Sequence, residues 1–371
     1  MTEDKATRYH RLKRQASLLS LVWLVTVLVG LSATGVSLAL RARAEAFAAG
    51  WPASSSLVVI LYVTALVCVL EVGGLPLAFY SGFLLERRYG LSTEPIGSWV
   101  KDRAKAFALE LPLSWAGAVL VYACIRWQPG LWWLVAGSLF SAVVVVLAHL
   151  APVLLLPIFY SVKPLARESL RARLLRLADR AGTRVLGVYE CGLGAKTRKA
   201  NAALTGWGAT RRILVSDTML ADYSEDEIEV VLAHELAHHV HGDIWKGIAL
   251  EGGLMVTGFY LAARVLEAGA ARAGLSGAAD VAGLPLLLLA AGAVSLVMVP
   301  LTHAVSRAFE RRADRFALGL TKNPQAFISA MRRLAAQNLA EDDPSRLVQW
   351  LFYSHPPIRE RIEMARGADV G

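Results

Sequence analysis

Six long apolar runs interrupt this chain, and they restrict its fold more than any other feature of the sequence. The runs are Ser17–Leu40, Ser56–Leu85, Phe107–Ile125, Leu131–Phe159, Ile244–Glu267 and Leu284–Val305. A helix of about 20 residues crosses the ~30 Å hydrocarbon core of a bilayer, so each run is long enough to span a membrane. Hydrophobic residues fill 55% of the 371 positions and charged residues only 19%, a composition too apolar for an ordinary soluble enzyme. The sequence therefore predicts a multi-pass helical membrane protein.

The basic residues give this protein an orientation. With six spans, both termini and the second and fourth loops share one side of the membrane. Those segments hold 33 of the 39 Lys and Arg residues, whereas the three opposite loops hold four. Because cytoplasmic loops retain Lys and Arg, we expect both termini and the segment 160–243 to be cytoplasmic. The net charge of +9 then reflects membrane orientation, and the expected partner is the lipid bilayer and not nucleic acid.

The spans divide the chain into four predicted regions. These are an N-terminal membrane region with four spans (1–159), a cytoplasmic segment (160–243), spans five and six (244–305) and C-terminal cytoplasmic helices (306–371). The cytoplasmic segment has helical apolar spacing over 168–182, followed by three short strand patterns, "RVLGVYE", "NAALTG" and "RRILVSD". Ser224, three residues before Glu227, then predicts a capping box that opens a helix. The expected fold is mainly α, polytopic, with a small α+β cytoplasmic domain.

The helix that follows this cap carries "AHELAHHVHGD", residues 233–243. His234 and His238 are four residues apart and thus about 40° apart around a helix, so both imidazoles can reach one metal ion. Glu235 lies beside them, where its carboxylate can reach a water on the metal. The alternative is a charged amphipathic helix, but the upstream cap and the apolar residues before His234 favour a metal site. His239 is expected to face solvent or only to make a hydrogen bond.

A catalytic zinc needs a third protein ligand, and Glu310 is the best candidate. It lies just beyond the sixth run, on the same side of the membrane as the histidines, and four residues before Asp314. Asp314 and Asp243 are expected to orient the liganding imidazoles. The alternative for Glu310 and Asp314 is a surface helix with ion pairs to nearby arginines. Weaker ligand candidates are Glu227, Glu229 and Glu251, and the ionisable residues inside the runs are Glu71, Glu110, His149 and Glu251.

Three segments, "VLAHELAHHVHGD", "SRAFERRADRFA" and "YSHPPIRER", together resemble the integral-membrane zinc endopeptidases related to CAAX prenyl protease 1. The resemblance extends to "GLPLAFYSGFLLERRYG" and "KANAALTGWGATRRILVSDTML" and covers nearly all of the chain after the first run. Two departures are the count of six spans, against seven in eukaryotic relatives, and Asp243, where those relatives often carry histidine. An excess of arginine, 30 against nine lysines, is typical of a bacterial member from a GC-rich genome.

This resemblance implies one zinc per chain, bound by His234, His238 and Glu310, with Glu235 as general base. It also implies that Asn201 and His355 contact the substrate backbone or the developing oxyanion, that Arg361 supports that site, and that the spans enclose a hydrated chamber. From the residues alone, Asn201 lies in a predicted strand whose edge can pair with an extended peptide. His355 precedes two prolines and is therefore held outside any helix.

The predicted activity is zinc-dependent endopeptidase cleavage of peptides or membrane-protein substrates, prenylated or unmodified, at the cytoplasmic face of the cell membrane. One alternative is a general quality-control membrane zinc protease with no preference for prenyl groups. A second alternative, from another class, is a non-catalytic membrane protein with a structural zinc site. Glu235 argues against the second, because a structural site needs no general base.

Overall fold

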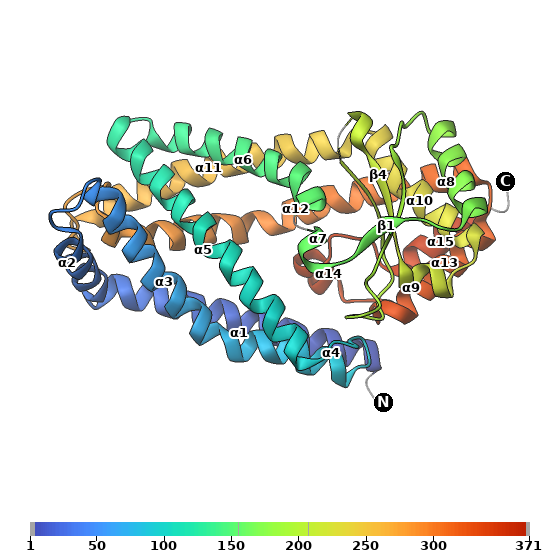
Figure 1. The fold of residues 1–371 in the computed structure, drawn as a ribbon, viewed down its shortest axis with the longest axis horizontal. Coiled ribbons are helices and arrows are strands. Elements are labelled where there is room, and N and C mark those ends of the chain that lie inside the picture. The colour runs from blue at the N-terminus through green and yellow to red at the C-terminus, as the bar shows by residue number, and fades with distance from the viewer. Residues whose placement is uncertain (1–3, 155, 207, 369–371) are drawn as a thin grey trace.

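Long helices form one end of the molecule in this computed structural model, and a small sheet with shorter helices forms the other (Figure 1). The structure describes residues 4–154, 156–206 and 208–368, so the extreme ends of the first and last predicted regions lie outside it. The long helices are α1 (Lys5–Ala33), α3 (Ser54–Phe79), α5 (Ile96–Trp127), α6 (Trp132–Leu154), α11 (Asp243–Ala270) and α12 (Leu284–Thr321). Each contains one of the six apolar runs or most of it.

The polytopic helical fold class is confirmed. Within the described residues, five of the long helices are long and apolar enough to cross a membrane, and α6 contributes a shorter apolar stretch, Trp132–Leu147. Figure 1 shows both termini at the end of the molecule that carries the sheet, with the short helix α2 (Val36–Ala48) at the opposite end. The count of six spans depends on α6 and stays a prediction; an even number of crossings would bring both termini to one side.

The helices do not coincide with the first and last apolar runs. The first run is not one helix: α1 begins at Lys5, ends at Ala33, and is followed by Gly35 in the left-handed region (φ +73°), after which α2 starts. A glycine adopts this conformation without strain, so the chain turns inside an apolar run that hydropathy reads as continuous. The last run ends at Val305, but α12 continues to Thr321 because no glycine or proline stops it there.

Short elements connect the long helices. The chain after α3 continues through a π-helical turn, η1 (Tyr80–Leu84), into α4 (Leu85–Arg88). A second short helix, α7 (Leu156–Phe159), follows α6 and leads into the sheet. The 3₁₀ turns are η2 (Gly208–Thr210) and η3 (Val281–Gly283).

Four strands make the sheet: β1 (Val162–Pro164), β2 (Gly187–Cys191), β3 (Ala202–Thr205) and β4 (Arg212–Ser216). Their order is β1-β2-β4-β3, with β2 and β4 parallel and the other two pairs antiparallel. The three predicted strands are present, whereas β1, only three residues long and ending in proline, was not predicted. Asn201 lies immediately before β3 and not within it, and β3 pairs only with β4, so it is an edge strand.

One face of the sheet is buried against helices. The helices of this end are α8 (Glu168–Arg180), α9 (Asp217–Asp222), α10 (Glu225–Val240), α13 (Pro324–Asn338), α14 (Arg346–Phe352) and α15 (Ile358–Ala368). Alternate strand residues, including Ala202, Leu204, Ile213 and Val215, join a core that also contains Leu232 of α10. This packing holds α10, which carries the histidines, rigidly beside the edge strand β3.

Candidate active site

The helix of the histidine motif starts where the sequence predicts. Ser224 caps α10: its hydroxyl accepts a hydrogen bond from the Glu227 N–H (3.2 Å), and the Glu227 carboxylate accepts one from the Ser224 N–H (2.8 Å). Glu227 also accepts hydrogen bonds from Ser329 and Arg333 of α13. Its carboxylate is therefore fully used in fixing the helix start, and it is not positioned as a metal ligand.

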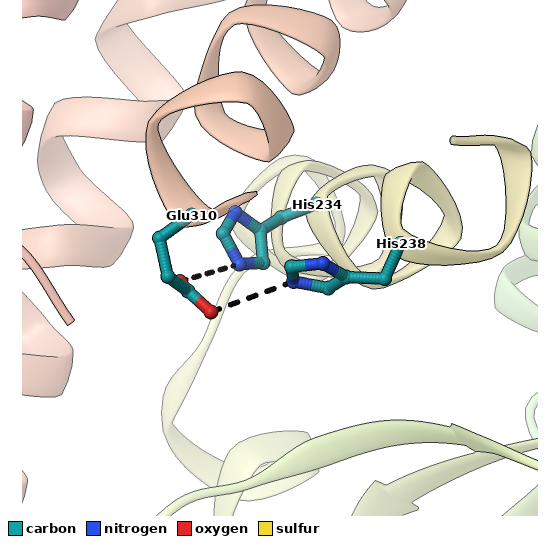
Figure 2. A group of neighbouring side chains, drawn as sticks. All are labelled: His234, His238 and Glu310. Atoms are coloured by element: carbon teal, nitrogen blue, oxygen red, sulfur yellow. Dashed lines mark ion pairs between the residues drawn. The ribbon is translucent and has the colours of Figure 1, made fainter. Parts of the chain in front are cut away.

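Three candidate ligands converge between α10 and α12 (Figure 2). The Nε2 atom of His234 lies 3.1 Å from Oε2 of Glu310, and Nε2 of His238 lies 3.5 Å from Oε1 of the same carboxylate. One ligand atom from each residue lies within 4.8 Å of the others. His234 and Glu310 are buried, and His238 is partly buried. The structure thus brings two imidazoles together with a carboxylate that lies 76 residues after His234 and 72 after His238 in the sequence.

This donor set fits a zinc-sized ion. Bonds of ~2.0–2.1 Å to a tetrahedral centre place neighbouring ligand atoms roughly 3.3 Å apart. The separations of 3.1 and 3.5 Å measured from Glu310 to the two imidazoles bracket that value. Nitrogen and carboxylate oxygen are also the ligand atoms that zinc takes in catalytic sites. His234, His238 and Glu310 are therefore the residues that could hold a metal.

Each histidine is held from behind by an Asp–Arg pair. The Nδ1 atom of His234 lies 2.8 Å from Asp314, whose two oxygens accept hydrogen bonds of 2.6 and 2.8 Å from Arg361. In the same way, Nδ1 of His238 lies 3.0 Å from Asp243, and Asp243 pairs with Arg312. A carboxylate at Nδ1 favours the tautomer with its proton there and leaves the Nε2 lone pair directed at Glu310.

These contacts give the predicted supporting residues definite places. Asp314 is fully buried and Asp243 nearly so, which makes their hydrogen bonds strong in a medium of low polarity. Arg361 is buried as well: it donates two hydrogen bonds to Asp314, and its Nη2 lies 3.4 Å from Nδ1 of His234. No sequence pattern indicated Arg312, which pairs with Asp243 behind His238.

The protonation of α10 follows from these surroundings. Burial alone would lower the pKa of His234, but the hydrogen bonds of Asp314 and Glu310 outweigh it and raise that pKa to about 9. Burial raises the pKa of the Glu235 carboxyl above its ordinary value, although the nearby imidazoles oppose the shift. An imidazole that prefers a proton when the site is metal-free also binds a cation in competition with that proton.

The expectation that His239 faces solvent or only makes a hydrogen bond holds in part, because the side chain is not fully exposed. Its side chain is partly buried, its Nε2 lies 3.4 Å from the carbonyl oxygen of Leu204, and burial lowers its pKa to about 4. Helical spacing places His239 away from His234 correctly, but the edge strand β3 lies against that side of α10. Spacing within one helix cannot show which neighbour covers each of its faces.

His355 reaches the same carboxylate from the C-terminal segment. Its Nε2 lies 3.3 Å from Oε1 of Glu310, and its side chain remains 61% exposed, open to an incoming group. The segment before it is anchored by Arg307, which donates hydrogen bonds to the carbonyl oxygens of Tyr353 (2.6 Å) and Gln349 (3.2 Å). Arg307 was missed, although its place three residues before Glu310 puts both on one face of α12.

Asn201 stands at the start of the edge strand, with its side chain exposed. Its backbone N–H donates to the Ser216 hydroxyl (3.0 Å), and its carbonyl accepts from the Ser216 N–H (2.9 Å). In the described part of the chain these backbone contacts tie Asn201 to β4 and not to the three candidate ligands.

The ionisable residues in the apolar helices have separate surroundings. Glu71 pairs with Arg103, and Glu251 lines a cavity of about 490 Å³ between α6, α11 and α12. Glu229, a weaker ligand candidate, pairs with Arg173. The side chain of His149 lies outside the described residues. The hydrated chamber as a whole stays a prediction.

Membrane-crossing helices, an HExxH helix and a carboxylate from a neighbouring helix together define a multi-pass membrane metallopeptidase. The comparison with known families agrees. Residues 164–369 match peptidase family M48, and residues 2–161 match the family described as CAAX prenyl protease N-terminal, five membrane helices. The chain belongs to peptidase family M48.

Individual relatives support this assignment. The chain is 34% identical over 290 residues to YhfN of Bacillus subtilis (strain 168), described as an uncharacterized metalloprotease, covering 76% of this chain and 68% of the relative. It is 27% identical to a CAAX prenyl protease 1 homolog of Oryza sativa subsp. japonica, covering 81% and 71% of the two chains. The crystal structure of Ste24p from S. mikatae matches its fold with a TM-score of 0.83 at 22% identity, over 97% of this chain and 88% of that one.

Proposed function

We propose that this protein is a zinc-dependent endopeptidase that cleaves peptides or membrane proteins at the cytoplasmic face of the membrane. The convergence of the His234 and His238 Nε2 atoms on Glu310 is the observation that carries the proposal. We infer one zinc per chain, held by these three residues. Membership of peptidase family M48 and the presence of Glu235 beside the ligands support a catalytic rather than a structural site.

Each residue of the site has a definite task in peptide hydrolysis. A zinc ion, when bound, polarises the scissile carbonyl and makes a water molecule more acidic. Glu235 takes the proton of the attacking water and later delivers it to the leaving amine. His355, exposed beside Glu310, donates a hydrogen bond to the negative charge that develops on the carbonyl oxygen. Arg361 and Asp314 keep His234 in the orientation that this geometry requires.

The edge strand β3 offers a backbone on which an extended substrate can lie. The pair Asn201–Ser216 is hydrogen-bonded across β3 and β4, and such pairs alternate along antiparallel strands. The backbone groups of Ala202 and Leu204 must therefore point away from β4, and the Leu204 carbonyl indeed meets His239 of α10. We propose that a substrate strand pairs with the outer edge of β3 and that Asn201 binds its backbone.

The proposed orientation follows from the positive charges. Both termini, 160–243 and 306–371 would be cytoplasmic, and 1–159 and 244–305 would form the membrane part. The names of the relatives include CAAX prenyl proteases, so a prenylated peptide is one substrate class to test. The site itself sets no requirement for a prenyl group, and the proposal covers unmodified peptides too.

Substituting Glu235→Gln tests the function directly. The change keeps size and polarity but removes the base, so zinc content should stay at one per chain while cleavage falls by at least ~10²–10⁴-fold. The purified protein in detergent or nanodiscs would be assayed on matched peptides with and without a prenyl group. Normal turnover by this variant, or no zinc-dependent cleavage by the wild type, would favour the structural-zinc alternative.

A further inference from the structure

An apolar cavity lies against the edge strand β3, and His234, His238 and Glu310 are not among its lining residues. It has a volume of about 440 Å³ and is lined by residues of α7 and of the sheet. Figure 1 shows α7 between the long helices and the sheet. Its lining side chains are mostly aliphatic and aromatic, and Asn201, the residue just before β3, is also part of the lining. The side chains that matter here are Leu156, Phe159, Leu193, Ala203, Thr205 and Leu214.

The strand residues show on which face this cavity lies. Ala202 and Leu204 of β3, with Ile213 and Val215 of β4, belong to the core shared with α10. Side chains alternate along a strand, so Ala203 and Leu214 point to the opposite face. Both line the cavity. The cavity and the histidine helix therefore flank β3 from opposite sides.

We propose that this cavity is a specificity subsite that binds a large aliphatic or aromatic side chain of the substrate. The inference rests on the proposed function, because it requires a peptide extended along β3. Successive residues of such a peptide alternate between the face of α10 and the face of the cavity. The occupant is thus a residue next to one that faces the metal ligands.

The lining explains why the occupant is apolar. Leu156, Phe159 and Leu214 present only hydrocarbon, so burying a charged group against them costs free energy that burying an apolar group does not. A leucine or phenylalanine side chain removes apolar surface from water on both sides of the contact. Ala203 and Thr205 of the edge strand β3 line this cavity, so a peptide paired with β3 would place alternate side chains beside it.

Filling the cavity from the strand tests the proposal. A series of peptides varied one position at a time among alanine, leucine and phenylalanine should show one position, or positions two apart, where the wild type prefers leucine or phenylalanine. In Ala203→Phe the ratio of kcat/KM for the large over the small residue should fall by roughly 10–100-fold at that position only. Leu214→Ala enlarges the cavity and should shift the preference toward tryptophan.

Leu186→Phe is the matched control, because Leu186 is 56% exposed, precedes β2 and lies outside the lining. Its selectivity ratio should equal that of the wild type. An unchanged ratio in both Ala203→Phe and Leu214→Ala, with cleavage still dependent on Glu235, would overturn the subsite and leave the peptidase proposal standing. If Ala203→Phe instead lost cleavage of prenylated peptides alone, the cavity would be assigned to a prenyl chain, and the proposed side-chain subsite would be overturned. If the Glu235→Gln variant cleaves peptides as fast as the wild type, the proposed function itself is refuted.

Discussion

Removing the buried guanidinium of Arg361 should destabilise this protein far more than removing an exposed one. Arg361 joins α15 to α12 through two hydrogen bonds to Asp314, and the two side chains are 9% and 0% exposed. Arg361→Ala leaves the Asp314 carboxylate buried with only the His234 imidazole as partner. Breaking a buried pair in this way costs about 3–5 kcal/mol, a large part of a typical folding free energy of about 5–15 kcal/mol.

The same two helices supply a matched control. Arg311 of α12 pairs with Glu360 of α15, but both side chains are 39% exposed, so Arg311→Ala should cost only about 0–1 kcal/mol. Reversible denaturant unfolding of both variants in the metal-free state measures the difference. Zinc competition with a chelator measures a second effect, a roughly 10–100-fold loss of affinity in Arg361→Ala because His234 is no longer held. Equal unfolding free energies for the two variants would refute the buried-pair argument.

Three further predictions concern ligands, substrate contacts and topology. Glu310→Ala should lose zinc, measured by elemental analysis, and one zinc per chain in that variant would exclude it as the third ligand. Asn201→Ala should mainly raise KM, while His355→Ala should lower kcat by roughly 10²–10³-fold, both with zinc retained; metal loss from the latter would make His355 a ligand or a ligand support. Cysteine labelling from outside intact cells should reach a probe at Ser276 and miss one at Gly367, and the reverse pattern would overturn the orientation.

The sequence predicted those features of the site whose residues all lie within one helix. The Ser224 capping box and the spacing of His234 and His238 lie within a single helix, and the structure reproduces both. Glu310 could be proposed only because the apolar run before it fixes the side of the membrane on which it emerges. The order of the apolar runs thus indicated that Glu310 and the histidines lie on the same side of the membrane, although they are far apart in the sequence.

The sequence did not predict other contacts between residues that lie far apart along the chain. Arg312 looks like any exposed helical arginine, and nothing near it in sequence indicates that it meets Asp243, 69 residues earlier. The burial of His239 depends on where the edge strand lies, which requires the sheet order. Arg307 was within reach, because its spacing from Glu310 and Asp314 puts all three on one helix face, but its partners Gln349 and Tyr353 lie over 40 residues away.

One continuous helix, α12, contains both the sixth apolar run and the candidate ligand Glu310. Hydropathy ends the sixth run at Val305, whereas the helix continues through Glu310 to Thr321. Five residues of helix advance at most about 8 Å, so the candidate third ligand lies within about the thickness of one headgroup layer from the apolar run. A helix that is continuous over this distance keeps Glu310 at a fixed distance from the end of the apolar run. We propose that a substrate anchored in the bilayer would need only a few extended residues, at ~3.3 Å each, to bring a peptide bond to the site.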